Sequence, residues 1–262
     1  MNSTHKQASD SPVILITGSG KRRVGNVVAE HFATLGYRIA LHYHSSREEA
    51  LGSRQRLLKE GADCEIFSAD VSNEDQVNEM IQHVHSHFGA LDVLVTTASI
   101  WSKTAWDEIT PDQIRRNFEI NTLGTFLCAR AAGNLMINQP KGGSIITIGD
   151  WAIERPYLDH APYFLSKGAI PTLTRVLAVE LAERNPNIRV NCIHPGPVMF
   201  PPETTEAEAE ELIQSTLLKK ANCPEMVAHA VEGFVRNQFI TGTCLPVDGG
   251  RSMHAPSEKR RQ

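Results

Sequence analysis

Apolar residues along the chain form short runs that alternate with longer stretches of helical periodicity. Short runs rich in β-branched side chains indicate buried strands, and apolar residues spaced three or four apart indicate helices with one buried face. The first pattern predicts strands over residues 13–17, 38–43, 64–68, 91–96, 144–148, 188–193 and 242–247. The second predicts helices over residues 24–35, 48–60, 73–88, 114–136, 163–184, 206–218 and 224–236.

The alternation of strands and helices predicts an α/β fold. Strands that are separated by helices pair in parallel, and the helices then cover both faces of the sheet. Right-handed crossovers give a Rossmann-type, doubly wound parallel sheet in three α/β/α layers, with its ligand crevice beyond the carboxyl ends of the strands. We therefore expect the functional residues in the loops that follow the strands.

One domain is expected over residues 12–252, because no repeat and no Pro/Gly-rich linker divides the sequence. Residues 1–11 are polar and residues 253–262 end in a short basic run, so we expect both ends to be flexible. The segment 195–223 is rich in Pro and Glu and is a candidate flap over the substrate.

Charge and composition favour a small-molecule partner. The formal net charge of −4 and the pI near 6.3 give no basic surface for nucleic acid or an anionic membrane. The polar start lacks the apolar stretch of a signal peptide, and no apolar run is long enough to span a bilayer. These features indicate a cytoplasmic protein.

The cysteines and histidines suggest neither a metal site nor a disulfide framework. The five cysteines lie far apart, and the alternating His83, His85 and His87 do not converge on one side of a helix. No metal is therefore expected, and a reducing compartment suits the thiols. The cysteines are Cys64, Cys128, Cys192, Cys223 and Cys244.

A glycine-rich turn between the first strand and the first helix is a candidate phosphate-binding site. In residues 17–25, Gly18 and Val24 stand beside the basic run Lys21, Arg22 and Arg23. Small residues let the backbone approach a pyrophosphate at the start of a helix. Such a turn also occurs as a plain connection without a ligand, so other features have to support this interpretation.

The end of the second strand favours NADP over NAD. Enzymes that prefer NAD place an acidic residue there for the ribose 2'-hydroxyl, whereas this strand is followed by His44, Ser45 and Ser46. With no carboxylate to repel a 2'-phosphate, four nearby basic residues can pair with one, although they can also be plain surface charges: Lys21, Arg22, Arg23 and Arg47. At the end of the third strand, Asp70 with Val71 can contact the adenine, or Asp70 can cap the next helix.

Tyr163 and Lys167 form a candidate acid–base pair. The spacing Tyr-x-x-x-Lys places both side chains on one face of a helix. We expect the ammonium to lower the pKa of the phenol, which can then pass a proton to a developing oxyanion or nitrogen. Alone, such a pair is more often a solvated helix face.

The order and intervals of several motifs resemble those of the short-chain dehydrogenases/reductases, over roughly residues 12–250. The resemblance implies hydride transfer from a nicotinamide, Tyr163 as proton donor, Lys167 on the nicotinamide ribose, and Asn121 holding a water in a proton relay. It also implies a homotetramer. The motifs are Thr17-Gly18 with Gly25, Asn121, Tyr163 with Lys167, Pro195-Gly196-Pro197-Val198 and Asp248-Gly249-Gly250; Pro195, Gly196 and Val198 are expected to contact the cofactor.

Asp150 departs from that family's usual pattern, because most members have a serine at this distance before the tyrosine. An aspartate there resembles the pteridine reductase-like branch, in which Asp150 would be a second proton donor. A carboxyl beside a phenol can share a proton with it or donate to a ring nitrogen. The alternative is that Asp150 is only a turn residue after its strand.

The loop after the fourth strand also departs from the family. It reads Thr96-Thr97-Ala98-Ser99 where an asparagine motif is usual, which puts the ordinary cofactor contacts in doubt. Ala98 and Ser99 remain candidates for contact with the cofactor, and Ser99 and Trp101 for contact with the substrate. Trp101 can stack on a flat heteroaromatic ring, or it can join Trp106 in a local apolar cluster.

The sequence therefore predicts an NADPH-dependent reductase of a pterin-like C=N bond, with Tyr163 and Asp150 as proton donors. One alternative is a carbonyl or 3-oxoacyl-thioester reductase that uses the same Tyr163 and Lys167. Another is a regulator that binds NADPH without turnover, which the altered loop after the fourth strand suggests.

Overall fold

The computed structural model describes residues 11–253, and its seven strands form one parallel sheet in the order β3-β2-β1-β4-β5-β6-β7. The strands are β1 (Val13–Thr17), β2 (Arg38–Tyr43), β3 (Cys64–Ser68), β4 (Val93–Thr96), β5 (Gly143–Ile148), β6 (Ile188–Pro195) and β7 (Cys244–Val247). The strand order reverses between β1 and β4, as in a doubly wound fold. The predicted Rossmann-type class is confirmed.

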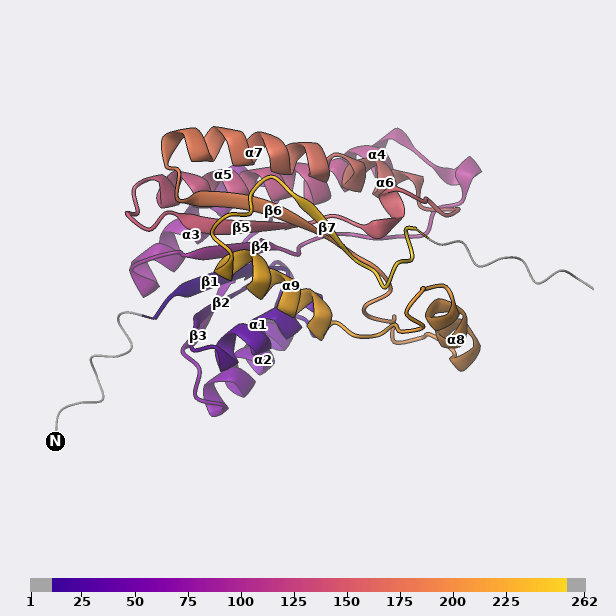
Figure 1. Cartoon of the computed structure of the whole chain (residues 1–262), viewed down its shortest axis with the longest axis horizontal. Helices are drawn as coiled ribbons and strands as arrows, with labels where there is room; N and C mark the ends of the chain where they lie inside the picture. Colours follow the sequence, from indigo (N-terminus) through magenta and orange to yellow (C-terminus); the bar gives the residue numbers. More distant parts are fainter. Residues whose placement is uncertain (1–10, 254–262) are drawn as a thin grey trace, which may run out of the picture.

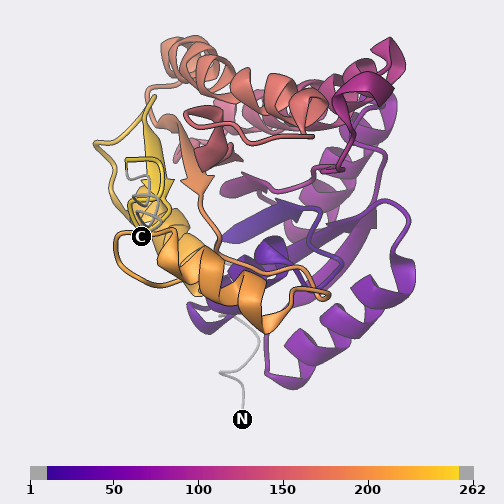
Figure 2. The ribbon, with the colours of Figure 1, turned by 90° about the vertical axis from the view of Figure 1, so that its right-hand side faces the viewer.

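Helices cover both faces of the sheet and complete three layers (Figure 1; Figure 2). On one face lie α3 (Glu74–Phe88), α5 (Gly124–Ile137) and α7 (Ile170–Arg184). On the other lie α1 (Val24–Thr34), α2 (Arg47–Lys59) and α9 (Glu225–Arg236). Helices α4 (Pro111–Asn117), α6 (Ala161–Gly168) and α8 (Glu206–Gln214) lie toward one end of the sheet (Figure 1).

Strand β1 shows why the sequence forms a sheet that is buried on both faces. Val13 and Leu15 point into the core under α3, α5 and α7, whereas Ile14 and Ile16 point into the core under α1, α2 and α9. All four side chains are fully buried. Successive residues of a strand point to opposite faces of the sheet. Because helices cover both faces here, every residue must be apolar, and an alternating apolar and polar sequence would bury polar side chains under one layer of helices.

Two predicted helices are interrupted. The helix expected over residues 114–136 begins earlier, at Pro111 after a Thr110 capping box, and has a π-helical stretch at Phe118–Leu123 before α5. The helix expected over residues 163–184 is divided at Ala169 into α6 and α7. Pro171 follows this break, and its ring lacks an N–H and clashes with the carbonyl of the preceding turn.

The segment 195–223 leaves the sheet and returns to it. The helix expected over residues 206–218 ends at Gln214, and α8 buries none of its side chains fully. It stands apart from the three layers (Figure 1). Over residues 11–253, none of the helices has the length and apolar character that crossing a membrane requires.

Candidate active site

Tyr163 and Asp150 meet at the carboxyl end of the sheet. Asp150 follows β5 directly, and Tyr163 lies in the first turn of α6. The phenol donates a hydrogen bond of 2.7 Å to Asp150 Oδ2, while Asp150 Oδ1 accepts one of 2.8 Å from the backbone of Ala152. Asp150 is therefore a turn residue after β5, as one of the two interpretations predicted. Its second carboxylate oxygen also accepts a hydrogen bond from Tyr163.

Lys167 is buried beside this pair. Its ammonium donates a hydrogen bond of 2.8 Å to the Ile148 carbonyl, at the last residue of β5. The nitrogen lies 5.9 Å from the centre of the Tyr163 ring. Tyr163 and Lys167 therefore lie on one face of α6, as their i,i+4 spacing predicted. In the structure this face meets the end of β5.

Burial governs the titration of these three groups. It raises the pKa of Tyr163 well above its usual value, and the neighbouring Asp150 raises it further. Burial also raises the pKa of Asp150, although the hydrogen bond from Tyr163 opposes this, and burial lowers the pKa of Lys167. The expectation that Lys167 lowers the phenol pKa is therefore wrong for this structure. The phenol stays protonated, which is the state that a proton donor needs.

Asn121 lies in the π-helical stretch and is fully buried. Its Oδ1 accepts hydrogen bonds from the Ile100 backbone at 2.8 Å and from the Ser99 hydroxyl at 3.0 Å. Its Nδ2 donates to the Ile100 carbonyl and to the Ser166 hydroxyl, both at 3.0 Å. These contacts hold the loop after β4 against α6, and the predicted relay through a water at Asn121 stays a prediction.

The glycine-rich turn needs glycine at two positions. Gly18 has φ of +69°, and a Cβ there would lie 2.8 Å from Ala98 Cα. A Cβ at Gly25 would lie 2.3 Å from the Thr97 hydroxyl oxygen. Close contact with the loop after β4 therefore excludes side chains at both positions.

The altered loop after β4 is tied to the same turn. The Thr97 hydroxyl donates to the Thr17 carbonyl, and the Ala98 backbone donates to the Thr17 hydroxyl at 3.2 Å. Thr97, at the position of the family's asparagine motif, therefore holds the loop after β4 against the end of β1. Ser99, whose hydroxyl bonds Asn121, is exposed at the edge of the crevice.

His42 is a structural residue of this turn that the sequence analysis did not identify. It is buried at the end of β2, where its Nδ1 accepts a hydrogen bond of 2.9 Å from the Gly18 backbone. Its Nε2 bonds the Ala69 carbonyl at 3.0 Å, which requires the neutral tautomer with the proton on Nε2. Burial lowers the pKa of His42 to about 4. A polar residue in an otherwise apolar strand was the available signal.

The predicted 2'-phosphate residues lie at the surface near the carboxyl end of β2. Lys21, Arg22 and Arg23 are exposed, and Lys21 lies 3.8 Å from Glu49. His44 and Ser45 are exposed after the strand, and Ser46 precedes α2.

Asp70 lies close to His44, with 3.9 Å between Oδ2 and the imidazole Nε2. The alternative in which it caps the next helix is wrong, because Asn73 caps α3 by accepting from the Gln76 backbone. Asp70 instead accepts hydrogen bonds from the hydroxyl and backbone of Ser72, and these bonds lower its pKa. Val71, the other predicted adenine contact, is buried.

The loop after β6 packs tightly against the end of β7. The Gly196 backbone donates 2.9 Å to the Val247 carbonyl, and a Cβ at Gly196 would lie 2.5 Å from Asp248 Cα. Pro195 ends β6, and the buried Val198 packs into the core under α9. These residues anchor the base of the segment 195–223.

Aromatic side chains line the outer side of Tyr163. Trp101 stacks on His160 with ring centres 4.6 Å apart, and its indole nitrogen donates 3.2 Å to the Tyr157 hydroxyl. Trp101 remains 52% exposed. Its local cluster therefore forms with Tyr157 and His160, and Trp106 stands outside it at 77% exposed.

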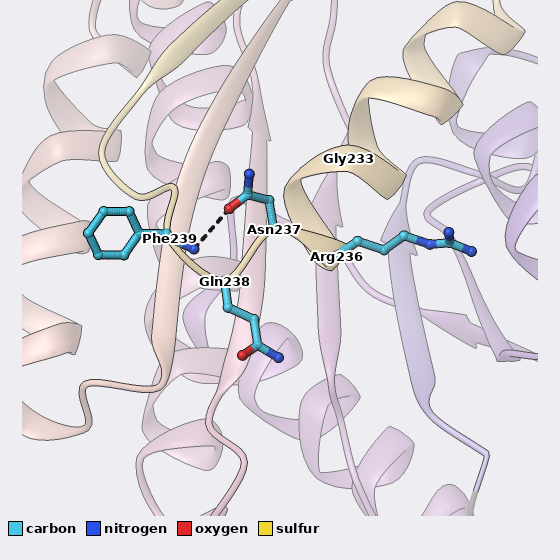
Figure 3. Close-up of a pocket in the computed structure, with 5 residues that line it drawn as sticks. All are labelled: Gly233, Arg236, Asn237, Gln238 and Phe239. Carbon is cyan, nitrogen blue, oxygen red and sulfur yellow. Dashed lines mark hydrogen bonds between the residues drawn. The ribbon is translucent and has the colours of Figure 1, made fainter.

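A hollow of about 580 Å³ lies elsewhere, at the end of α9 (Figure 3). Gly233, Arg236, Asn237, Gln238 and Phe239 line it. These residues precede β7, so the hollow is at the amino end of that strand, whereas Tyr163 and Asp150 are at the carboxyl end of the sheet. It contains none of the predicted acid–base residues.

Comparisons with known proteins agree with this arrangement. A family model described as enoyl-(acyl carrier protein) reductase matches residues 19–252. A short-chain dehydrogenase/reductase of Armillaria gallica is 34% identical over 92% of this chain and 96% of that protein. A putative ketoacyl reductase 2 of the granaticin polyketide synthase of Streptomyces violaceoruber is 32% identical over 93% and 97%. The structure of a gluconate 5-dehydrogenase from Burkholderia cenocepacia J2315 in complex with NADP and tartrate superposes with a TM-score of 0.84, at 28% identity, over 94% of this chain and 97% of that one.

Proposed function

The chain belongs to the short-chain dehydrogenase/reductase family, and from that premise we propose that it is an NADPH-dependent reductase of a pterin-like C=N bond. The observation that carries this proposal is the 2.7 Å hydrogen bond from Tyr163 to Asp150. It places two groups that can hold a proton side by side, at the end of the sheet where this fold binds its ligands.

The residues at the carboxyl ends of β1 and β2 fit NADP. The left-handed backbone of Gly18, pressed against Ala98, keeps the turn free of side chains where a pyrophosphate would lie. No carboxylate directly follows β2, and Arg22 and Arg23 are exposed near that strand end for a 2'-phosphate. The gluconate dehydrogenase described above was crystallised with NADP, which supports the same assignment.

NADPH, when bound, would supply a hydride to the substrate. Tyr163, protonated because burial raises its pKa, would give a proton from its hydroxyl to the substrate atom next to the reduced carbon. Asp150 would either replace that proton on Tyr163 through the 2.7 Å contact or, instead of Tyr163, donate the one proton to the ring nitrogen itself. Both routes need its carboxyl in the protonated form. Burial raises the pKa of Asp150 and thereby favours that form.

Lys167 and Asn121 would position these donors. The Lys167 ammonium is held by the Ile148 carbonyl at the end of β5, and from there it would bind the nicotinamide ribose. Asn121 fixes the loop that carries Ser99 and Trp101, the two predicted substrate contacts. With Trp101 half-exposed and held by Tyr157 and His160, an indole face is available for a flat ring.

Reduction of a ketone or 3-oxoacyl thioester is the second candidate function. The relatives support it, because one of them is a putative ketoacyl reductase, and they give no support to a pterin over a carbonyl substrate. In that reaction Tyr163 would give the one proton to the carbonyl oxygen, and Asp150 would serve only as its hydrogen-bond partner. A non-catalytic role is disfavoured because Tyr163, Lys167 and Asp150 are assembled at one point.

Turnover of defined substrates separates these functions. NADPH oxidation should be followed with dihydrobiopterin, dihydrofolate and a 3-oxoacyl thioester, and the whole series should be repeated with NADH. The proposal expects turnover of a pterin substrate and preference for NADPH. Turnover of the thioester alone would make the protein a carbonyl reductase, and NADPH binding without any turnover would support the regulator.

We also propose that the chain assembles into a homotetramer. Leu177 and Leu181 of α7 and Leu127 of α5 are buried within the single chain and belong to its core. Val176 and Val179 on the outer side of α7 are instead 52% and 72% exposed, which supports a partner there. Light scattering on the eluting protein would give the mass, and a monomeric mass would refute the assembly.

A further inference from the structure

A cluster of three metal-binding side chains lies outside the proposed reaction centre. Cys192 and His194 belong to β6, and Cys244 begins β7. Their ligand atoms all lie within 4.8 Å of one another. None of them takes part in the proton transfer described above.

Strand geometry alone brings these residues together. Cys192 and His194 are two residues apart in one strand, so their side chains point to the same face of the sheet. Cys244 pairs in register with Cys192 on the neighbouring parallel strand, which places it on that face too. Cys192 and Cys244 are far apart in the sequence and come together only because β6 and β7 pair. For this reason the spacing of the cysteines in the sequence did not indicate a metal site.

One of the possible metal-ligand atoms, His194 Nε2, has no hydrogen-bond partner among the described residues. His194 is 5% exposed, and its Nε2 is buried without a hydrogen-bond partner among the described residues 11–253. A buried imidazole nitrogen without a partner carries the desolvation cost of that group with nothing to offset it. A cation bound at this nitrogen would remove that cost.

Gly149 provides the room for this imidazole. A Cβ at Gly149 would lie 2.8 Å from His194 Nε2 and 3.3 Å from Cys192 Sγ. Any side chain at that position would therefore crowd both ligand atoms. Gly149 directly precedes Asp150, so the cluster lies immediately behind the proposed reaction centre.

The chemistry of the ligands selects the metal. Two sulfurs and one imidazole suit Zn²⁺, whereas Ca²⁺ and Mg²⁺ require oxygen ligands. Sulfur ligands about 2.3 Å from a tetrahedral zinc ion lie about 3.8 Å apart, which small side-chain rotations can reach from the observed separations.

We propose that Cys192, His194 and Cys244 form a binding site for one zinc ion, with a water or a further ligand in the fourth position. The cluster is at the junction of β6 and β7, on the face covered by α7. Cys192 and His194 are buried, and the partly exposed Cys244 gives the ion a route of entry from the edge of the sheet.

Zinc titration of the full chain tests this site. Reduced protein without a histidine tag would be stripped of metal and titrated with Zn²⁺ against a chromophoric chelator. We expect one zinc per chain, and Co²⁺ in place of zinc should give a thiolate-to-metal charge-transfer band. Cys244→Ser and His194→Gln should each weaken zinc binding by more than about tenfold, since loss of even an outer-sphere partner costs that much.

Cys223→Ser is the matched control, because Cys223 is also partly exposed but lies outside the cluster. This variant should bind zinc as the parent does. Circular dichroism would show which variants are folded, and Cys244→Ser decides the outcome if His194→Gln does not fold. Absence of stoichiometric binding by the reduced parent chain, or unchanged affinity in folded Cys244→Ser, would overturn the proposal.

Discussion

The two sides of the candidate active site are built differently. On the cofactor side, the turn after β1 is fixed by backbone contacts: Gly18 bonds the buried His42, and Gly25 packs against Thr97. On the substrate side, Trp101 is 52% exposed and Leu158 is 87% exposed, and α8 buries none of its side chains fully. The proposed function thus places the dinucleotide against a part of the chain that the sheet fixes, and makes substrate choice depend on loops that the sheet does not constrain.

Removing the proton donor should have the largest effect on activity, while the cofactor side stays intact. Tyr163→Phe deletes the hydroxyl that bonds Asp150 but leaves the turn at Gly18 intact. We expect kcat/KM to fall by about 10³-fold, within the range for loss of a general acid. NADPH affinity, measured by fluorescence titration, should change little. Equal turnover by parent and variant would show that another group donates the proton.

His42→Leu should lower the stability of the fold, because His42 holds the turn on the cofactor side. The substitution leaves the Gly18 N–H and the Ala69 carbonyl without their buried partner. We expect the free energy of unfolding to fall by about 2–3 kcal/mol, measured by urea denaturation at neutral pH. Trp101→Ala is the control on the substrate side, and its unfolding free energy should stay within about 1 kcal/mol of the parent.

The same histidine gives a pH dependence of stability. Its pKa is lowered from 6.5 to about 4 in the folded chain, so the unfolded chain binds the proton more readily. The stabilisation by neutral His42 is therefore complete above about pH 6.5 and is lost as the pH falls toward 4. Urea denaturation at several pH values should show this loss in the parent, and His42→Leu should show a shallower decline. Identical slopes would contradict the assignment.

Replacing both arginines beside the turn should affect only cofactor choice. Arg22→Ala with Arg23→Ala removes the charges proposed to meet the 2'-phosphate, and both residues are exposed, so folding should not change. We expect the preference for NADPH over NADH, as a ratio of kcat/KM values, to fall by about tenfold, which corresponds to about 1.4 kcal/mol. Arg184→Ala, at an exposed arginine at the end of α7, is the control. An unchanged ratio would place the phosphate elsewhere.

Trp101→Ala should have the smallest effect and should act only on the substrate side. Loss of one stacking surface costs about 0.5–1.5 kcal/mol, so KM for a pterin should rise by about fivefold. Trp106→Ala is the control, since Trp106 is exposed and outside the aromatic cluster. A similar change in both variants would mean that Trp101 is only a surface residue.

The sequence was sufficient for the sheet but not for all of the site. The strands are apolar runs with clear ends, and each prediction lies within about two residues of the observed strand. The helices containing Asn121 and Lys167 were predicted as continuous, because periodicity does not show a π-helical stretch or the effect of Pro171 in the middle of an apolar pattern.

The missed features depend on burial and strand pairing. Periodicity did not show that His42 is buried or that Asp150 and desolvation raise the pKa of Tyr163. The cluster of Cys192, His194 and Cys244 forms only when β6 and β7 pair in register. A resemblance to a family locates the reacting residues, but their protonation states follow from the packing around them.

The most direct test of the central claim is the effect of Asp150→Ser on two substrates. The ratio of kcat/KM for dihydrobiopterin to that for a 3-oxoacyl thioester should be measured for the parent and the variant across the pH range. If Asp150 donates a proton, the variant should lose about 100-fold on the pterin and little on the thioester. The parent's pterin activity should also fall as the pH rises through the raised pKa of Asp150, and the variant should lack that step. Equal losses on both substrates, with an unchanged pH profile, would contradict the account and leave Asp150 as a structural residue.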